Sequence, residues 1–311
     1  MLTFLRKLKL TYAVYNFFHK NELIHNVPIY KKSGLNKKYY SPISSKDFTD
    51  INENKMNMAS IQEIKNCPIY NTLNTESQES LLNFNNTGFA VLQKYLTLQE
   101  VAAVNTEIDN LLTSKRVKFR YRNKIMFAIH LSKILNSIGE NENLKQLLST
   151  LMGGKAKLFQ SINFLMGSEQ DTHSDSIHMT TYPLGGLLGV WIALDDITLE
   201  NGPLHYYAGS HQLPYYLNRD YDNEGTYFTL GSKGYEAYEG MIAKKIEEHK
   251  IEKTVFLAKK GDLLIWHANL FHGGNKHIDK TQTRKSMVLH YFNEKAICYH
   301  EITQRPALMK M

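Results

Sequence analysis

The sequence is poor in cysteine and proline and has no long apolar run. Its 311 residues include two cysteines, Cys67 and Cys298, too few and too far apart for a disulfide framework or a cysteine-based metal motif. Cysteine usage of this kind favours a reducing compartment, so a cytoplasmic location is expected. No apolar stretch approaches the roughly 18 residues that cross a bilayer. The start of the chain mixes charged and apolar residues and has no secretory cleavage site, so a signal peptide is not expected.

The sequence also has no phosphate-binding glycine loop and no internal repeat. With 42% hydrophobic, 11% aromatic and 22% charged residues, it is typical of a globular protein and not of a disordered one. These proportions supply enough apolar material for one large core or two small ones.

The net charge of +7 is concentrated in one segment. Residues 1–40 hold eight Lys or Arg and one acid, so they account for the whole excess, and the rest of the chain is neutral. A basic stripe on the folded domain is therefore not indicated, and no nucleic-acid partner is expected. A basic helix over residues 1–26, with Leu5, Leu8, Tyr12 and Tyr15 one turn apart, would suit peripheral contact with an anionic membrane. Docking of that helix on the protein's own core is the alternative.

Two parts of the chain differ in organisation. Residues 1–75 are interpreted as a basic extension followed by a polar connecting segment with one short helix near Ser60–Lys65. Residues 76–311 form the predicted main domain, in which Thr97 and Glu100 make a capping box. A helical stripe follows, formed by Leu98, Val101, Val104, Ile108 and Leu111.

Short apolar runs separated by Gly, Asn or Asp begin at about residue 158. Most have the length of a strand and are rich in aromatic and β-branched residues. Many short strands broken by turns are typical of a barrel or a double-sheet jelly roll. A further helix is predicted within 235–250.

A candidate metal site follows the first of these strands. His173 and Asp175 are two residues apart, so on a strand both side chains would reach the same side. Two histidines and one carboxylate leave ligand positions open and suit non-haem Fe(II). The pair alone is a weak signal, because a second His-x-Asp occurs at His277 and Asp279.

The motifs that surround this pair, taken together, resemble the phytanoyl-CoA dioxygenase family of Fe(II)- and 2-oxoglutarate-dependent oxygenases over roughly residues 80–295. They are the HSD triplet, the WIALDD strand, the NGPL and GSH turns, GD before the distal strand, HGG, and a downstream arginine. The resemblance implies a mainly β fold with flanking helices, a double-stranded β-helix of the cupin-like jelly-roll type. It also implies that His173, Asp175 and His272 bind Fe(II), with His267 as the rival for the distal ligand.

The same resemblance implies a pocket for 2-oxoglutarate. Arg284 would bind its far carboxylate, since the planar guanidinium of arginine forms paired hydrogen bonds with carboxylates, and Ser286 would add a donor from the same face of the strand. Asn163, Gln160 and Trp191 resemble other residues that contact or line this pocket.

The implied reaction consumes O2 and 2-oxoglutarate and releases succinate and CO2 while a C–H bond of a small molecule is oxidised. Because Asp175 is present, hydroxylation is favoured over halogenation, and desaturation and ring formation are the remaining alternatives. Substrate contacts are expected from 219–250, where the helix could act as a lid, and from His178, Thr180, Tyr182, Tyr206 and Arg219. The alternatives are an inactive binding or scaffold protein and a jelly-roll isomerase or hydrolase that uses zinc or manganese. The sequence identifies neither the substrate nor the oligomeric state.

Overall fold

The computed structural model describes residues 5–121 and 123–309. Its strands form one large and two small antiparallel sheets. The large sheet has the order β1 (Phe89–Leu92), β8 (Leu263–His267), β5 (Leu187–Ala193), β10 (Ser286–Asn293), β3 (Ala156–Phe164) and β2 (Lys124–Met126). The small sheets have the orders β7 (Thr254–Phe256), β6 (Leu204–Tyr206), β9 (His272–Gly274), and β12 (Arg305–Pro306), β11 (Ile297–His300), β4 (Thr180–Tyr182).

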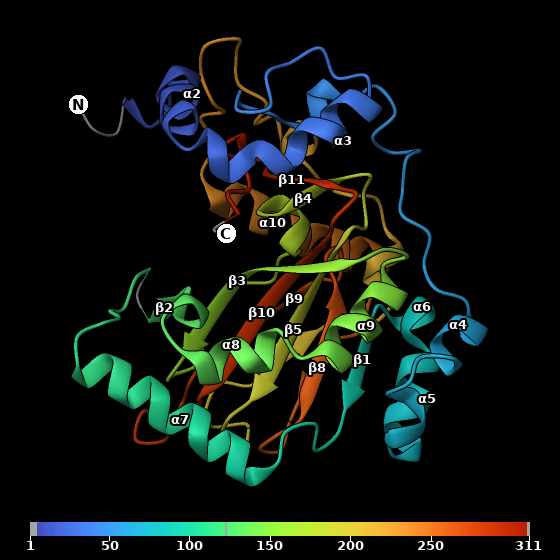
Figure 1. Cartoon of the computed structure of the whole chain (residues 1–311), viewed down its shortest axis with the longest axis vertical. Helices are drawn as coiled ribbons and strands as arrows, with labels where there is room; N and C mark the ends of the chain where they lie inside the picture. Colours follow the sequence, from blue (N-terminus) through green and yellow to red (C-terminus); the bar gives the residue numbers. More distant parts are fainter. Residues whose placement is uncertain (1–4, 122, 310–311) are drawn as a thin grey trace.

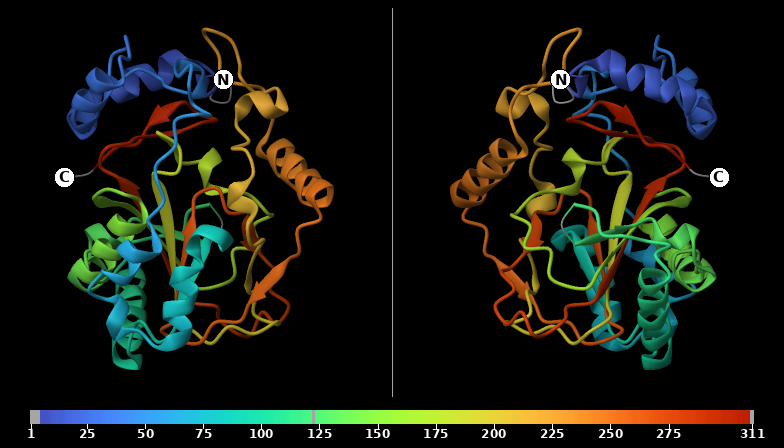
Figure 2. Two further views of the ribbon diagram at one scale, coloured as in Figure 1. Left: turned by 90° about the vertical axis from the view of Figure 1, so that its right-hand side faces the viewer. Right: turned by 90° about the vertical axis from the view of Figure 1, so that its left-hand side faces the viewer.

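The sheets and helices are arranged in layers. Figure 2 shows the large sheet edge-on, with helices on one face and the small β7-β6-β9 sheet and helix α10 (Tyr235–His249) beyond the other. Strands far apart in sequence are neighbours throughout the large sheet, which is typical of a jelly roll. The predicted double-stranded β-helix with flanking helices is confirmed.

The central strand β5 explains why the large sheet is buried on both faces. All of its residues are buried. Leu188, Val190 and Ile192 belong to the core shared with the helices, whereas Trp191 and Ala193 belong to the cluster between the sheets. Because alternate residues of a strand point to opposite faces, one strand supplies both cores.

Helices cover the outer face and the β1 edge of the large sheet (Figure 1). They are α4 (Ile61–Lys65), α5 (Thr75–Leu82), α6 (Phe84–Thr87), α7 (Leu98–Thr113), α8 (Lys133–Gly139) and α9 (Glu142–Leu151). Helix α7 begins at the predicted capping box: the Glu100 N–H donates to Thr97 Oγ1 at 3.2 Å, and the Thr97 N–H donates to the Glu100 carboxylate at 2.8 Å. The predicted stripe is buried except for Leu98, which is exposed.

The remaining helical segments connect these layers. Short 3-10 turns are η1 (Lys20–Asn26), η2 (Ser45–Asp47), η3 (Tyr70–Thr72), η4 (Ala128–His130), η5 (Asp175–Ile177), η6 (Ser210–Gln212) and η7 (Asn218–Tyr221). In the part of the chain that the structure describes, no helix is both long and apolar enough to cross a membrane.

The N-terminal segment lies over the β4-β11 sheet at the top of Figure 1 and contains α2 (Lys9–Phe18) and α3 (Val27–Lys32). It is more than a polar connection. Tyr30, Ile43 and Phe48 form a buried cluster with residues of β4 and β11, and the buried Glu301 carboxylate accepts hydrogen bonds from the Ser45 N–H and hydroxyl. Residues 59–70 pack into the main core, with α4 at the predicted place.

The packing of Phe48 predicts that the N-terminal segment unfolds together with the main domain. Its ring stacks on Tyr182 with centroids 3.9 Å apart. Phe48→Ala should lower the free energy of unfolding by about 3–5 kcal/mol, measured by urea denaturation followed through tryptophan fluorescence, because both tryptophans lie in the main domain. The exposed Leu98→Ala should change it by less than about 0.5 kcal/mol. An unshifted tryptophan transition in Phe48→Ala would show that the segment is an independent unit.

Candidate metal centre

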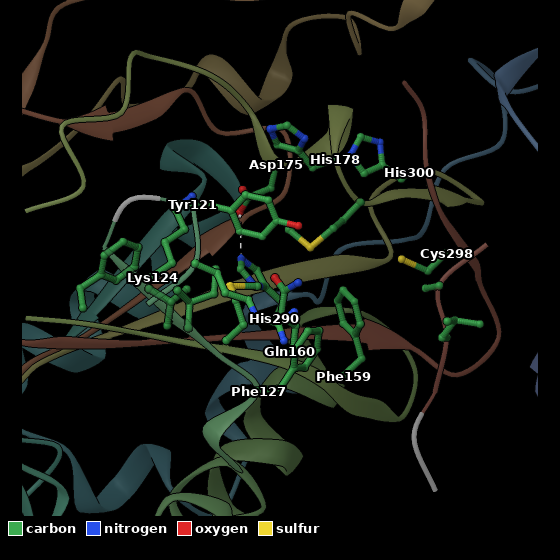
Figure 3. A pocket seen from close by; sticks show the side chains of 18 of the residues that line it. Tyr121, Lys124, Phe127, Phe159, Gln160, Asp175, His178, His290, Cys298 and His300 are labelled. Carbon is green, nitrogen blue, oxygen red and sulfur yellow. Dashed lines mark ion pairs between the residues drawn. The ribbon is translucent and has the colours of Figure 1, made fainter. Parts of the chain in front are cut away.

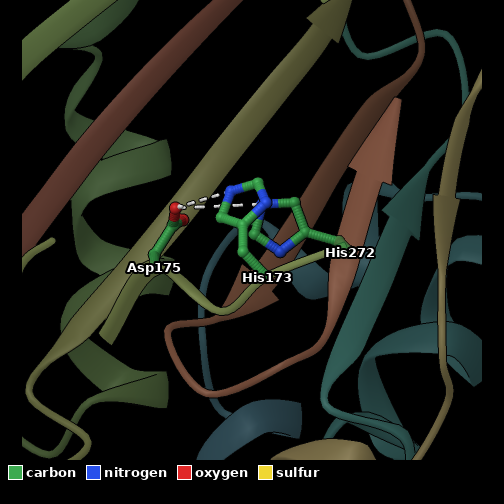
Figure 4. Close-up of side chains that lie close together, drawn as sticks. All are labelled: His173, Asp175 and His272. Atoms are coloured by element: carbon green, nitrogen blue, oxygen red, sulfur yellow. Dashed lines mark ion pairs between the residues drawn. The ribbon is translucent and has the colours of Figure 1, made fainter. Parts of the chain in front are cut away.

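Three buried side chains converge between the large sheet and the β7-β6-β9 sheet (Figure 4). The ligand atoms of His173, Asp175 and His272 all lie within 4.8 Å of one another. The Nε2 atoms of both histidines are 3.8 Å from Oδ1 of Asp175. Ligands bonded at about 2 Å to one ion lie roughly 3 Å apart, so the three atoms surround a space the size of a metal ion.

Backbone pairing and a turn, and not the alternation of side chains along one strand, bring these residues together. His173 forms a bridge with His272 in which each N–H donates to the other residue's carbonyl oxygen at 2.9 Å. Asp175 is the first residue of η5, so the expectation that His173 and Asp175 share one strand is wrong. The bridge fixes the two imidazoles side by side, and the turn brings the carboxylate back toward them.

Each ligand is oriented by a second hydrogen bond. The Nδ1–H of His173 donates to the Asp171 carbonyl at 2.8 Å, and that of His272 donates to the Leu270 carbonyl at 3.0 Å. Both Nε2 lone pairs therefore face the space between the ligands. Asp175 accepts at Oδ2 from the Trp266 indole N–H at 2.8 Å, which leaves Oδ1 for a metal.

The electrostatics of the site favour the protonation states that bind metals. Burial and the neighbouring His272 hold the pKa of His173 well below its usual value. Burial opposes ionisation of Asp175, but His272, His290 and His173 outweigh it and lower the pKa of that carboxyl. A neutral imidazole and an ionised carboxylate are the forms in which these side chains coordinate metals.

The rival histidines lie elsewhere. His267 is buried, its Nδ1 accepts from the Asn269 N–H at 3.1 Å, and burial lowers its pKa to about 3. Its ring faces His211 with centroids 5.4 Å apart. His277 hydrogen-bonds to backbone carbonyls of its own turn. His272 therefore lies with His173 and Asp175, whereas His267 and His277 do not.

Arg284 is a buried cation without an acidic partner. Its side chain is 2% exposed, and no carboxylate of the described residues lies within ion-pair distance. Its Nη1–H donates to Ser286 Oγ at 2.9 Å and its Nε–H to the Gly202 carbonyl at 3.1 Å, and its guanidinium carbon lies 5.1 Å from the ring centroid of Trp191. Burial lowers its pKa to about 10. An unpaired buried charge is costly, so the position calls for an anionic ligand.

Asp195 holds the segment that carries this arginine. Its Oδ2 accepts from the Thr283 hydroxyl at 2.6 Å and from the Lys285 N–H at 2.9 Å. The two residues that flank Arg284 are thereby fixed, a role that no sequence motif indicated.

The triad and Arg284 line one cavity of about 1390 Å³. Figure 3 shows part of its lining, with Asp175, Lys124 and Gln160 among the labelled residues. Of the residues predicted to contact ligands, Gln160, Trp191 and His178 also line it. The indole N–H of Trp191 is buried and has no acceptor among the described residues, which leaves a donor for a ligand. The cavity thus offers a metal-binding triad, a buried cation and a free donor.

Asn163 is not brought to this cavity. It pairs with Met287 on β10 and Ile125 on β2, both of which belong to the core under the helices. The adjacent residue, Ile162, lines the cavity instead. The prediction that Asn163 contacts the co-substrate is therefore contradicted, because neighbouring residues of a strand face opposite ways.

Four other substrate candidates also lie outside the cavity lining. The Thr180 hydroxyl donates to the Ser176 carbonyl. Tyr206 packs on Phe89, and Tyr182 hydrogen-bonds to Asp50. Arg219 is exposed and donates to Asn52.

The predicted lid, α10, instead packs directly on the metal-binding loop. The Tyr238 and Ser174 hydroxyls are 2.8 Å apart, and the Tyr235 and His178 rings are 4.6 Å apart. The helix therefore supports the loop between His173 and Asp175.

Lys124 is a site residue that the motifs did not identify. Its ammonium donates to Gln170 Oε1 at 3.1 Å, and Gln170 Nε2 lies 3.1 Å from Nε2 of His173. Burial lowers the pKa of Lys124, although Asp175 acts in the opposite direction. In the sequence, Lys124 could have been noticed because it ends a basic segment, residues 115–124.

That segment corrects the expectation that the folded domain carries no basic stripe. Basic residues of 115–124 line the cavity: Lys115, Arg116, Lys118, Arg120 and Lys124. His290 is a further residue of the site, with Nε2 at 3.5 Å from Oδ2 of Asp175. It shares a face of β10 with Ser286, so alternation from Arg284 would have found it.

Solved structures share this fold. The non-heme alpha ketoglutarate dependent carbocyclase SnoK from nogalamycin biosynthesis superposes with a TM-score of 0.59 and 15% identity, over 73% of this chain and 87% of that one. EctD from S. alaskensis with 2-oxoglutarate and 5-hydroxyectoine gives 0.53 and 21%, over 70% and 76%.

Curated relatives carry related names. Phytanoyl-CoA dioxygenase domain-containing protein 1 of Mus musculus is 35% identical over 94 residues, which are 29% of this chain and 32% of the relative. Phytanoyl-CoA dioxygenase 1 of Oryza sativa subsp. japonica is 26% identical over 181 residues, 57% of this chain and 59% of the relative. The chain thus matches about a third of the mouse protein. The family model described as Phytanoyl-CoA dioxygenase (PhyH) matches residues 84–285, well over half of the sequence, and the chain belongs to this family.

Proposed function

We propose that this protein is an Fe(II)- and 2-oxoglutarate-dependent oxygenase that hydroxylates a C–H bond of a small molecule. The observation that carries the proposal is the unpaired, buried Arg284 in the same cavity as the His173, Asp175 and His272 triad. A triad of this kind leaves half of an octahedral coordination sphere open, which suits non-haem Fe(II). Of the solved proteins with the same fold, SnoK is alpha ketoglutarate dependent and EctD was solved with 2-oxoglutarate.

The residues of the chain fit 2-oxoglutarate at both ends. Arg284 and Ser286 would hold the far carboxylate, and the Trp191 indole N–H offers a further donor. Lys124 and Gln170, beside His173, would stabilise the carboxylate of the keto-acid end near the metal. A dicarboxylate thereby gains a cation at each end inside a buried cavity, where charge-assisted hydrogen bonds are strongest.

Bound iron would supply the activation of O2 coupled to decarboxylation of 2-oxoglutarate. The protein's part is to position the ligands and exclude water. Trp266 keeps Asp175 in place, and the apolar wall beyond the triad, with Phe159, Met179 and Phe127, would hold the carbon skeleton of the substrate (Figure 3). The complete triad argues against a scaffold role. A hydrolase or isomerase would not need the buried, unpaired cation of Arg284.

Arg284→Gln should weaken 2-oxoglutarate binding by about 100-fold or more, because it removes the buried cation that pairs with the carboxylate. Anaerobic titration of 2-oxoglutarate into the Fe(II)-loaded protein, followed by the weak visible charge-transfer band of the chelate, measures this directly. Lys285→Gln is the matched control, since Lys285 pairs with Asp109 and does not line the cavity. Equal affinity in wild type and Arg284→Gln would refute the role of Arg284.

Asp175→Asn should abolish tight Fe(II) binding while leaving the fold intact, because the amide keeps an acceptor for Trp266 but loses the anionic ligand. Metal affinity should fall by at least about tenfold, the lower end of what loss of even an outer-shell partner costs. Calorimetric titration with Mn(II) as a redox-stable probe gives the affinity. Asp171→Asn is the control, because that exposed carboxylate lies nearby and only its backbone carbonyl contacts His173. Unchanged metal affinity in Asp175→Asn would mean that the triad is not the metal site.

A further inference from the structure

The side of helix α2 that lies against the protein carries Tyr12 and Ala13, which are half-buried, and Asn16. Its buried residue is Asn16, which is 1% exposed. Leu10, Val14, Phe17 and Phe18 follow the i, i+4, i+7, i+8 spacing of one helix face, and they are 70%, 49%, 47% and 77% exposed. A surface helix of a globular protein ordinarily buries such a stripe. Phe17 meets the Tyr40 ring edge-on with centroids 5.7 Å apart, and the rest of this apolar face stays largely exposed.

A second apolar element stands beside the start of α2. Residues 226–229 form a turn whose tip carries Tyr227 and Phe228, which are 86% and 72% exposed. Backbone hydrogen bonds join the turn to the helix: the Lys9 N–H donates to the Phe228 carbonyl at 2.9 Å and the Leu230 N–H to the Lys7 carbonyl at 2.8 Å. The turn and α2 lie together at one end of the molecule (Figures 1 and 2). We call α2 and residues 226–229 the apical surface.

Basic side chains surround the apical surface. Arg6 and Lys7 are exposed at the start of the helix, and the Lys20 ammonium lies 5.3 Å from the ring centroid of Phe17. Residues 1–40 carry the whole net charge of +7. Covering the surface with a second copy of the chain would bring two such segments together, which like-charge repulsion disfavours. An anionic partner with an apolar interior matches both properties.

We propose that the apical surface docks on a lipid membrane that contains anionic lipids. An amphipathic helix with aromatic residues on one face and lysines beside it lies in the plane of the interface, with its apolar face among the headgroups and upper acyl chains. Tyr227 and Phe228 insert beside it, and the basic residues contact the anionic headgroups. The proposal concerns peripheral contact and does not depend on the proposed oxygenase function.

The cavity of the metal centre extends to this end of the molecule. Tyr15, Asn16 and His19 line it, together with residues of the basic segment 115–124. That segment also exposes Phe119 and Tyr121, which are 45% and 77% exposed. Docking therefore brings the cavity wall formed by α2 close to the lipid, and, if the proposed function holds, gives a membrane-borne substrate a short path to the triad.

The test is flotation of the full chain with phosphatidylcholine vesicles that contain about 30% phosphatidylserine and with vesicles of phosphatidylcholine alone. Wild type should bind the anionic vesicles more tightly, and binding should weaken as salt screens the headgroups. Replacing Phe18, Tyr227 and Phe228 together by serine should weaken binding by at least about tenfold, since each apolar side chain removed from the interface is worth a comparable factor. Leu98→Ser with Ile278→Ser is the control, because both residues are equally exposed outside the apical surface.

Three results would overturn the proposal. Wild type does not float with either vesicle, the control pair loses as much binding as the triple variant, or light scattering shows a dimer that the triple variant converts to a monomer. The last result would assign the surface to a second copy of the chain. None of the three substituted residues lines the cavity, so the Fe(II) and 2-oxoglutarate titration should be unchanged in the triple variant. Failure of the docking proposal is thus distinguishable from failure of the proposed function.

Discussion

The paired backbone hydrogen bonds between His173 and His272 are the contact on which the metal centre depends. They join the loop that follows β3, a strand of the large sheet, to β9, a strand of a small sheet. The two imidazoles therefore meet only after the sheets have stacked. Trp266 on β8 then fixes Asp175 from a third direction. The site is a product of the closed jelly roll, and local sequence alone cannot assemble it.

The cavity buries charges of both signs at separate places. Asp175 contributes a buried negative charge at one place, and Arg284 a buried positive charge at another, without ion-pairing to each other. In the proposed complex, a divalent cation would pair with the first and a carboxylate of the co-substrate with the second, with Lys124 as a further cation near the metal. Buried charges that lack a partner are costly. Ligands of opposite charge would offset that cost, so the polar groups are better explained as ligand contacts than as supports of the fold.

The sequence predicted those parts of the site that lie in short, ordered motifs. His173, Asp175, His272 and Arg284 could be picked out because their spacing and flanking turns form a recognisable series, and the capping box of α7 is a local signal. Asn163 failed because a strand position off by one residue faces the opposite side, and β3 itself contains an extra residue, Phe159, at its register shift against β10. Lys124 and His290 were missed because no motif includes them, although Lys124 ends a basic segment and His290 shares a face of β10 with Ser286.

The packing of the N-terminal segment likewise could not be predicted from local sequence patterns, and this packing bears on the proposed membrane contact. Periodicity predicted a helix, yet not which face it buries, and the stripe expected from Leu8, Tyr12 and Tyr15 differs from the exposed stripe in the structure. The reason lies downstream, where Tyr30, Ile43 and Phe48 anchor the segment on β4 and β11. This anchor holds α2 at the edge of the cavity without using its apolar face. If α2 needed its apolar face for folding, that face could not also contact a membrane. Because other residues anchor the segment, the segment can be folded while this face contacts lipid.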